Sequence, residues 1–137
     1  MDMRYLKAID RVKFTAADLE KLLEAAPVKT FEDRQACLIF KSLSEDLRSA
    51  ASRVEGFVKP VVEGKLHEMD GGKFELVSAN GKSMGAFSCG SPLEVYSQAE
   101  GQWFPGRVEH KNGYYYFYCA DLDHPALFTG MKARTRE

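Results

Sequence analysis

The sequence predicts an α+β protein in which an N-terminal helical hairpin packs on a small antiparallel β-barrel of five or six strands. Apolar residues recur at helical spacing over residues 1–62, whereas residues 63–137 alternate with a period of two between glycine-containing turns. Apolar residues make up 45% of the 137 residues and charged residues 28%, so the chain can build a folded core. We therefore predict a helical region at 1–62 and a β-barrel at 63–137.

Two helices are expected in the first half. The first covers residues 16–26, because Thr15 is an N-cap residue and Pro27 ends the apolar pattern. Thr30 with Asp33 marks the start of the second, which ends by Gly56 or at the latest near residue 60. A third helix before residue 15 is an alternative, since apolar side chains also recur there: Tyr5, Leu6, Ile9 and Val12.

The second helix carries an apolar seam over three heptads: Ala36, Phe40, Leu43, Leu47, Ala50, Val54 and Phe57. A helix of about 25 residues is about 38 Å long, so it must find partners along its whole length. Packing on the rest of the chain favours a monomer. A homodimeric coiled coil through this helix is the alternative, although alanine takes two of the seven seam positions.

In the second half, strands are expected at residues 73–78, 83–88, 93–97, 102–111 and 113–119, with a short last strand at 131–134. Asn80-Gly81 is a turn between the first two. Five or six short antiparallel strands are more than one flat sheet holds comfortably, so we expect them to curl into a barrel.

The strongest turn signal is Asn112-Gly113, because a two-residue type I′ hairpin loop needs positive φ at both positions. This turn pairs Val108 with Phe117 and His110 with Tyr115. Val108 and Phe117 should face the interior. The register separates His110 from Cys119 by about 13 Å, too far to share a metal ion. The opposite face collects Trp103, Arg107, Glu109, Tyr114, Tyr116 and Tyr118.

So much aromatic surface is seldom left bare, and the helical half is its expected cover. The alternative is a platform for a peptide, a cationic side chain or unpaired bases. The candidate binding surface is then Tyr96, Trp103, Arg107, Tyr116 and Tyr118.

Several classes of function are not expected. The net charge is −1, with 11 basic and 11 acidic residues in 1–64 and 8 and 9 in 65–137, so neither half resembles a duplex-DNA binder. Nucleophile and metal motifs are missing, so we expect no enzyme, no catalytic residue, no metal and no cofactor. Three widely spaced cysteines and no membrane span or signal peptide indicate a cytoplasmic protein.

The block "CGSPLEVYSQAEGQWFPGRVEHKNGYYYFYCADLDHPALFTGMKAR" has a G-x-P-ψ-E-V strand, W-x-P-x-R-V-E, an aromatic strand and a closing G-M-x-A-R. It resembles SH3-like barrels of the Tudor and Agenet kind. It is still more similar to an uncharacterised bacterial family, a domain of unknown function common in Gram-positive and mobile-element genomes. The resemblance covers about residues 73–135 and implies an SH3-like fold, with no activity to carry over.

The functional expectation is a non-enzymatic binding or adaptor module with a protein partner. A single-stranded nucleic-acid-binding accessory protein of a mobile element is the alternative. It would use the tyrosines with the basic residues Arg107, Lys111, Arg134 and Arg136.

Overall fold

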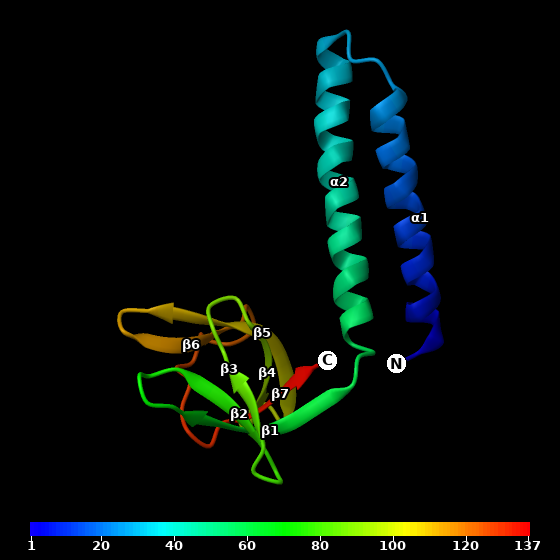
Figure 1. Cartoon of the computed structure of the whole chain (residues 1–137). Coiled ribbons are helices and arrows are strands. Elements are labelled where there is room, and N and C mark those ends of the chain that lie inside the picture. The colour runs from blue at the N-terminus through cyan, green and yellow to red at the C-terminus, as the bar shows by residue number, and fades with distance from the viewer. The chain divides into compact units, whose positions relative to one another are not determined.

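A computed structural model describes all residues, Met1–Glu137, and divides into two compact units, Met1–Lys59 and Pro60–Glu137. The first unit consists of two antiparallel helices that lie side by side, α1 (Met3–Ala25) and α2 (Phe31–Gly56) (Figure 1). The second unit is all β-structure. Neither helix combines the length and the apolarity that crossing a membrane requires.

Residues Met3–Ala25 form one continuous helix, so the predicted start at Thr15 and the separate third helix are wrong. Asp2 is the N-cap of α1, since its carboxylate accepts a hydrogen bond from the Arg4 backbone N–H at 2.8 Å. The Thr15 hydroxyl instead donates to the Arg11 carbonyl at 2.9 Å, one turn back within the helix. Because its hydroxyl bonds to a carbonyl within the helix, Thr15 is not an N-cap, and α1 continues on both sides of it.

The predicted start of α2 is confirmed. The Thr30 hydroxyl accepts from the Asp33 N–H, and the Asp33 carboxylate accepts from the Thr30 N–H, each at 3.0 Å. This reciprocal pair is a capping box. Its hydrogen bonds from the backbone N–H groups of Lys29 and Thr30 hold the pKa of Asp33 below its usual value.

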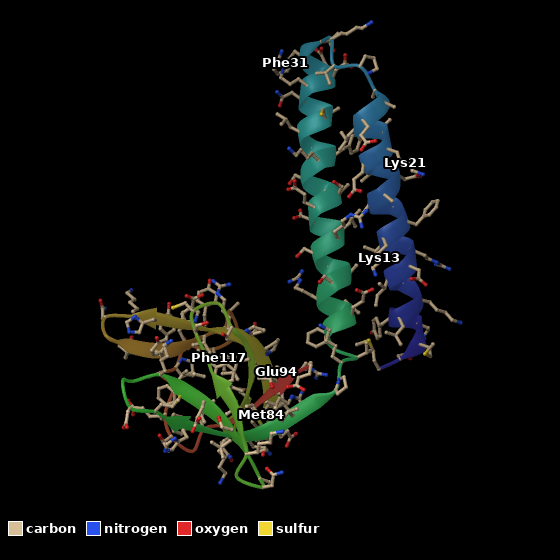
Figure 2. All side chains as sticks on the ribbon, in the orientation of Figure 1. Lys13, Lys21, Phe31, Met84, Glu94 and Phe117 are labelled. Atoms are coloured by element: carbon tan, nitrogen blue, oxygen red, sulfur yellow. The ribbon has the colours of Figure 1, made fainter.

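Ion pairs join the two helices, between Arg48 and Glu20 and between Lys13 and Glu55. Figure 2 labels Lys13 on α1. The apolar seam predicted for α2 does not point wholly at α1. The buried positions of α2 are Ser44 and Ala51, whereas Leu43, in the seam, is 42% exposed.

The β-unit contains seven strands: β1 (Val61–Glu68), β2 (Phe74–Ser78), β3 (Ser83–Ala86), β4 (Pro92–Ser97), β5 (Gln102–Lys111), β6 (Tyr114–Tyr118) and β7 (Lys132–Arg136). They form one antiparallel sheet in the order β3-β2-β1-β7-β4-β5-β6. The predicted five- to six-stranded barrel is wrong, because the sheet has seven strands and is open: β3 and β6 are its two ends and do not pair.

The strand that was not predicted is β1, in a segment expected to be a connection after the helices. It lies between β2 and β7 near the middle of the sheet. Its alternation is weak because Leu66 is its one fully buried side chain and the inward position at 64 is glycine. A Cβ there would come within 2.2 Å of the Val77 carbonyl oxygen, so only glycine fits where β2 crosses.

The hairpin is confirmed in register and in turn type. Lys111 pairs with Tyr114 and Val108 with Phe117, and both turn residues have positive φ, 52° at Asn112 and 82° at Gly113. Val108 and Phe117 are fully buried in the hydrophobic core of the β-unit. The opposite face of β4, β5, β6 and β7 carries the candidate site.

Candidate functional site

A cluster of aromatic rings and cations lies where β4, β5 and β7 adjoin. Tyr96 pairs with Trp103 across β4 and β5, and their rings meet edge to face with centroids 5.4 Å apart. The Lys132 ammonium lies 4.6 Å from the Tyr96 centroid, and the Arg134 guanidinium 4.2 Å from the Trp103 centroid. Both distances are within the range of cation–π attraction, so the chain's own cations cover these rings.

Glu94 holds the two arginines of this cluster. Its carboxylate accepts from Arg134 Nε at 2.9 Å and from Arg136 Nε at 2.5 Å, and it is 12% exposed. Burial alone would raise the pKa of Glu94, but the hydrogen bonds from Arg136 and Arg134 outweigh it and keep the pKa below its ordinary value. Glu94 therefore stays ionised and fixes Arg134 over Trp103.

A second cluster surrounds Tyr118 on β6. The Arg107 guanidinium lies 4.2 Å from the centroid of its ring, and the His124 imidazole stacks on the ring at 4.5 Å and 10°. Glu109 accepts a hydrogen bond from Arg107 at 2.7 Å. His124 has a positive φ of 47° and accepts the Cys119 backbone N–H at its Nδ1. The Tyr118 ring is held between two cationic or ionisable side chains of its own chain.

The five predicted surface residues therefore fall into two groups, Tyr96 with Trp103 and Arg107 with Tyr116 and Tyr118. Trp103 and Arg107 are four residues apart on β5, which separates them by about 13 Å. The prediction that the helical half covers Tyr116 and Tyr118 stays a prediction. Tyr118 is 39% exposed.

Four residues of the two clusters and the adjoining pocket were not predicted from the sequence: Glu94, His124, Phe128 and Lys132. Strand alternation could have placed Glu94 beside Tyr96. Lys132 reaches Tyr96 through the pairing of β4 with β7, which begins 36 residues further along the chain than Tyr96. No local pattern predicts that pairing.

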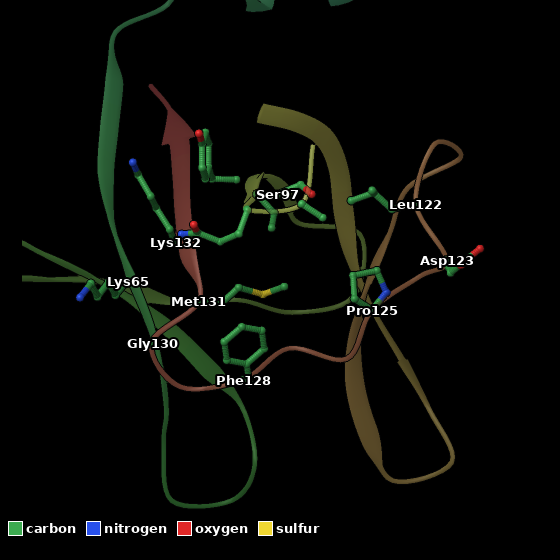
Figure 3. A pocket seen from close by; sticks show the side chains of 13 residues that line it. Lys65, Ser97, Leu122, Asp123, Pro125, Phe128, Gly130, Met131 and Lys132 are labelled. Atoms are coloured by element: carbon green, nitrogen blue, oxygen red, sulfur yellow. The ribbon is translucent and has the colours of Figure 1, made fainter. Parts of the chain in front are cut away.

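A pocket of about 610 Å³ opens at the end of β4 and the start of β7 (Figure 3). The Met131 side chain reaches toward Pro125, with the ring of Phe128 beside it (Figure 3). Most of the lining is apolar: Val95, Tyr96, Leu122, Pro125, Phe128 and Met131. Its charged lining residues are Lys65, Asp123 and Lys132.

Lys65 and Lys132 are directly opposite each other on β1 and β7. Like charges at paired positions of an antiparallel sheet repel each other. No ion pair joins either ammonium to a carboxylate of the chain. An anionic group at this rim would relieve the repulsion.

The fold and site define a class: an α+β protein whose open antiparallel sheet carries two cation–aromatic clusters and an apolar pocket with a basic rim. No three or more His, Cys, Asp or Glu side chains gather closely enough to hold a metal ion.

Residues 66–135, which are 70 of the 137 residues, match the family described as Domain of unknown function (DUF5348). The chain belongs to this family, which confirms the resemblance to an uncharacterised family of that kind. The match runs from the second half of β1 into β7 and leaves both helices outside. Neither a curated protein nor a solved structure matches the chain.

Proposed function

We propose that the β-unit is a non-enzymatic protein-binding module whose pocket takes an apolar side chain from an acidic segment of the partner protein. The observation that carries this proposal is the repelling pair Lys65 and Lys132 at the rim of an apolar pocket. Carboxylates beside the apolar side chain would neutralise both ammonium groups while the side chain is buried.

The state of the aromatic rings also favours the pocket over the aromatic platform. Arg134 lies over Trp103, and Tyr118 has Arg107 and His124 against it. A cationic ligand or a nucleic-acid base would have to displace these neighbours before it could stack. Arg107, Arg134 and His124 do not line the pocket, so an apolar side chain can enter it without displacing them.

Two short dye-labelled peptides test the proposal by fluorescence anisotropy, one with phenylalanine between glutamates and one with phenylalanine between lysines. The protein should bind the first and discriminate against the second. Charge reversal at both rim positions, Lys65→Glu with Lys132→Glu, should invert the preference. Lys111→Glu, at the hairpin end and outside the pocket lining, is the matched control and should leave the preference unchanged.

A glutamate peptide with glycine in place of phenylalanine separates pocket binding from simple charge attraction, and it should bind much more weakly. Equal binding of the glycine and phenylalanine peptides, or a preference that survives the double charge reversal, would contradict the proposal.

Single-stranded nucleic acid is the second candidate, favoured by the adjacent cations Lys65, Lys132 and Arg134 on β1 and β7. Glu63 and Glu94 lie among these cations and offset part of their charge. A labelled oligonucleotide tested at about 50 mM salt decides between the candidates, because phosphate binding is strongest at low salt. We expect no shift there, and a salt-sensitive shift would favour the nucleic-acid function.

A further inference from the structure

The helical unit buries very little of its own apolar surface. Its fully buried apolar residues are Ile9, Ala16 and Ala51, while Ile39 is 64% exposed and Leu43 is 42% exposed. Two helices with so small a shared core are marginal by themselves, because helical stability comes mainly from packing of an apolar face. The unit has an apolar face without a partner inside the unit.

This face has contributions from both helices. In α2 its residues directly precede those that face α1: Leu43 precedes Ser44, and Ala50 precedes Ala51. One residue is a rotation of about 100° around the helix, so the face lies to one side of the helix–helix contact.

The same one-residue offset occurs in α1, where Thr15 precedes the buried Ala16. Because the helices are antiparallel, the same sense of rotation directs both stripes to the same side of the hairpin. We call this surface the hairpin face; its members are Ala8, Val12, Thr15, Leu19 and Leu22 on α1 with Ala36, Ile39, Leu43 and Ala50 on α2, and the charged Asp46 and Arg53 lie on the same stripe of α2.

We infer that the hairpin face binds the hairpin face of a second copy, so that two hairpins form an antiparallel four-helix bundle. This inference is independent of the pocket and of its proposed ligand. Three properties of the face favour a second copy over another occupant.

The first property is size. The 26 residues of α2 span about 39 Å, and two helices at an interaxial distance of about 9 Å present a face about 18 Å wide. The product is about 700 Å², close to the roughly 800 Å² per partner of a stable interface. A partner must offer an apolar face of matching length, and a second hairpin does so by symmetry.

The second property is charge. Residues 1–59 contain 11 basic and 10 acidic residues, a net charge of +1, so two copies scarcely repel each other. An acidic or basic partner gains nothing from this face.

The third property is self-complementarity about Leu43. Ala36 and Ala50 lie seven residues to either side, and Glu32 and Arg53 lie eleven and ten residues to either side. A twofold axis opposite Leu43 places alanine against alanine and Glu32 of one copy near Arg53 of the other. Neither Glu32 nor Arg53 is in an ion pair within the chain.

Light scattering coupled to size exclusion tests the inference on the full chain. At tens of micromolar the mass should be twice the 15.4 kDa of one chain. Leu43→Asp should give a monomer. Leu38→Asp is the matched control, since Leu38 is 57% exposed on the same helix but lies off the face, and that variant should remain dimeric.

A charge exchange identifies the partner surface and does not depend on core packing. Glu32→Arg or Arg53→Glu alone should weaken the dimer about tenfold, because each like-charge contact occurs twice in a symmetric interface. The double variant should restore the dimer, with helix content checked by circular dichroism throughout.

A monomeric full chain at these concentrations would overturn the inference. A dimer that survives Leu43→Asp, or a double exchange that restores nothing, would equally overturn it.

Discussion

Glu94→Gln should destabilise the β-unit by about 2 kcal/mol at neutral pH. The carboxylate is 12% exposed and accepts hydrogen bonds from two guanidinium groups, those of Arg134 and Arg136. Hydrogen bonds to charged groups contribute about 1.5–3 kcal/mol, and exposed ion pairs about 0–1 kcal/mol. Glutamine retains one acceptor oxygen but loses the charge, so a value between these limits is expected.

The assay is urea denaturation followed by the emission of Trp103. This is the single tryptophan of the chain, so the signal reports the β-unit and not the helices. Arg134 lies over its ring, so Glu94→Gln should also shift the emission of the folded state by loosening that contact.

The pH dependence gives a second test of the same carboxylate. Its pKa in the folded state is below the ordinary value of 4.5, so its stabilising effect is complete above pH 4.5 and is lost as the pH falls through the folded-state pKa. The difference between wild type and Glu94→Gln should therefore shrink on acidification below pH 4.5. A difference that is constant down to pH 3, or absent at pH 7, would refute the role assigned to Glu94.

Two further substitutions test the sheet. Gly106→Ala should lower the free energy of unfolding by about 2–3 kcal/mol, because a Cβ there would lie 2.3 Å from the Tyr118 carbonyl oxygen. Gly56→Ala is its control and should leave the free energy of unfolding unchanged, because a Cβ at Gly56 would meet nothing within 4 Å. Tyr118→Ala should lower the free energy of unfolding by about 2 kcal/mol, because the buried part of the ring and its contact with Arg107 are lost. Tyr114→Ala should lower it by less, because Arg107 lies over the Tyr118 ring. Thermal denaturation measures all four, and equal effects within either pair would contradict the reasoning.

Local signals in the sequence were sufficient for some of this structure. The capping box at Thr30 and Asp33 and the turn at Asn112-Gly113 each depend on residues within a few positions of one another. The turn then set the pairing of β5 with β6. For these elements the chemistry that specifies the structure is contiguous in the chain.

Other features depended on choices that the sequence alone leaves open. Thr15 can cap a helix or bond to the carbonyl one turn back, and the neighbouring turns of α1 decided in favour of the second. The place of β1 in the sheet, and with it the open topology, depends on pairing with β7 across some 70 residues. The same kind of long-range pairing sets Lys132 over Tyr96, so half of the candidate site had no local signal.

The segment after β6 performs two tasks at once. Pro125 and Leu127 hydrogen-bond to the outer edge of β6, through Phe117 and Tyr115, at 2.8 and 3.0 Å. Pro125 and Phe128 also form a wall of the pocket. If this wall moved outward to admit a bulkier ligand, the hydrogen bonds to the edge of β6 would break. The exposed strand edge could then pair with a strand of another chain. Tolerance toward larger ligands and resistance to aggregation are thus opposed in this domain, and selection for one should limit the other.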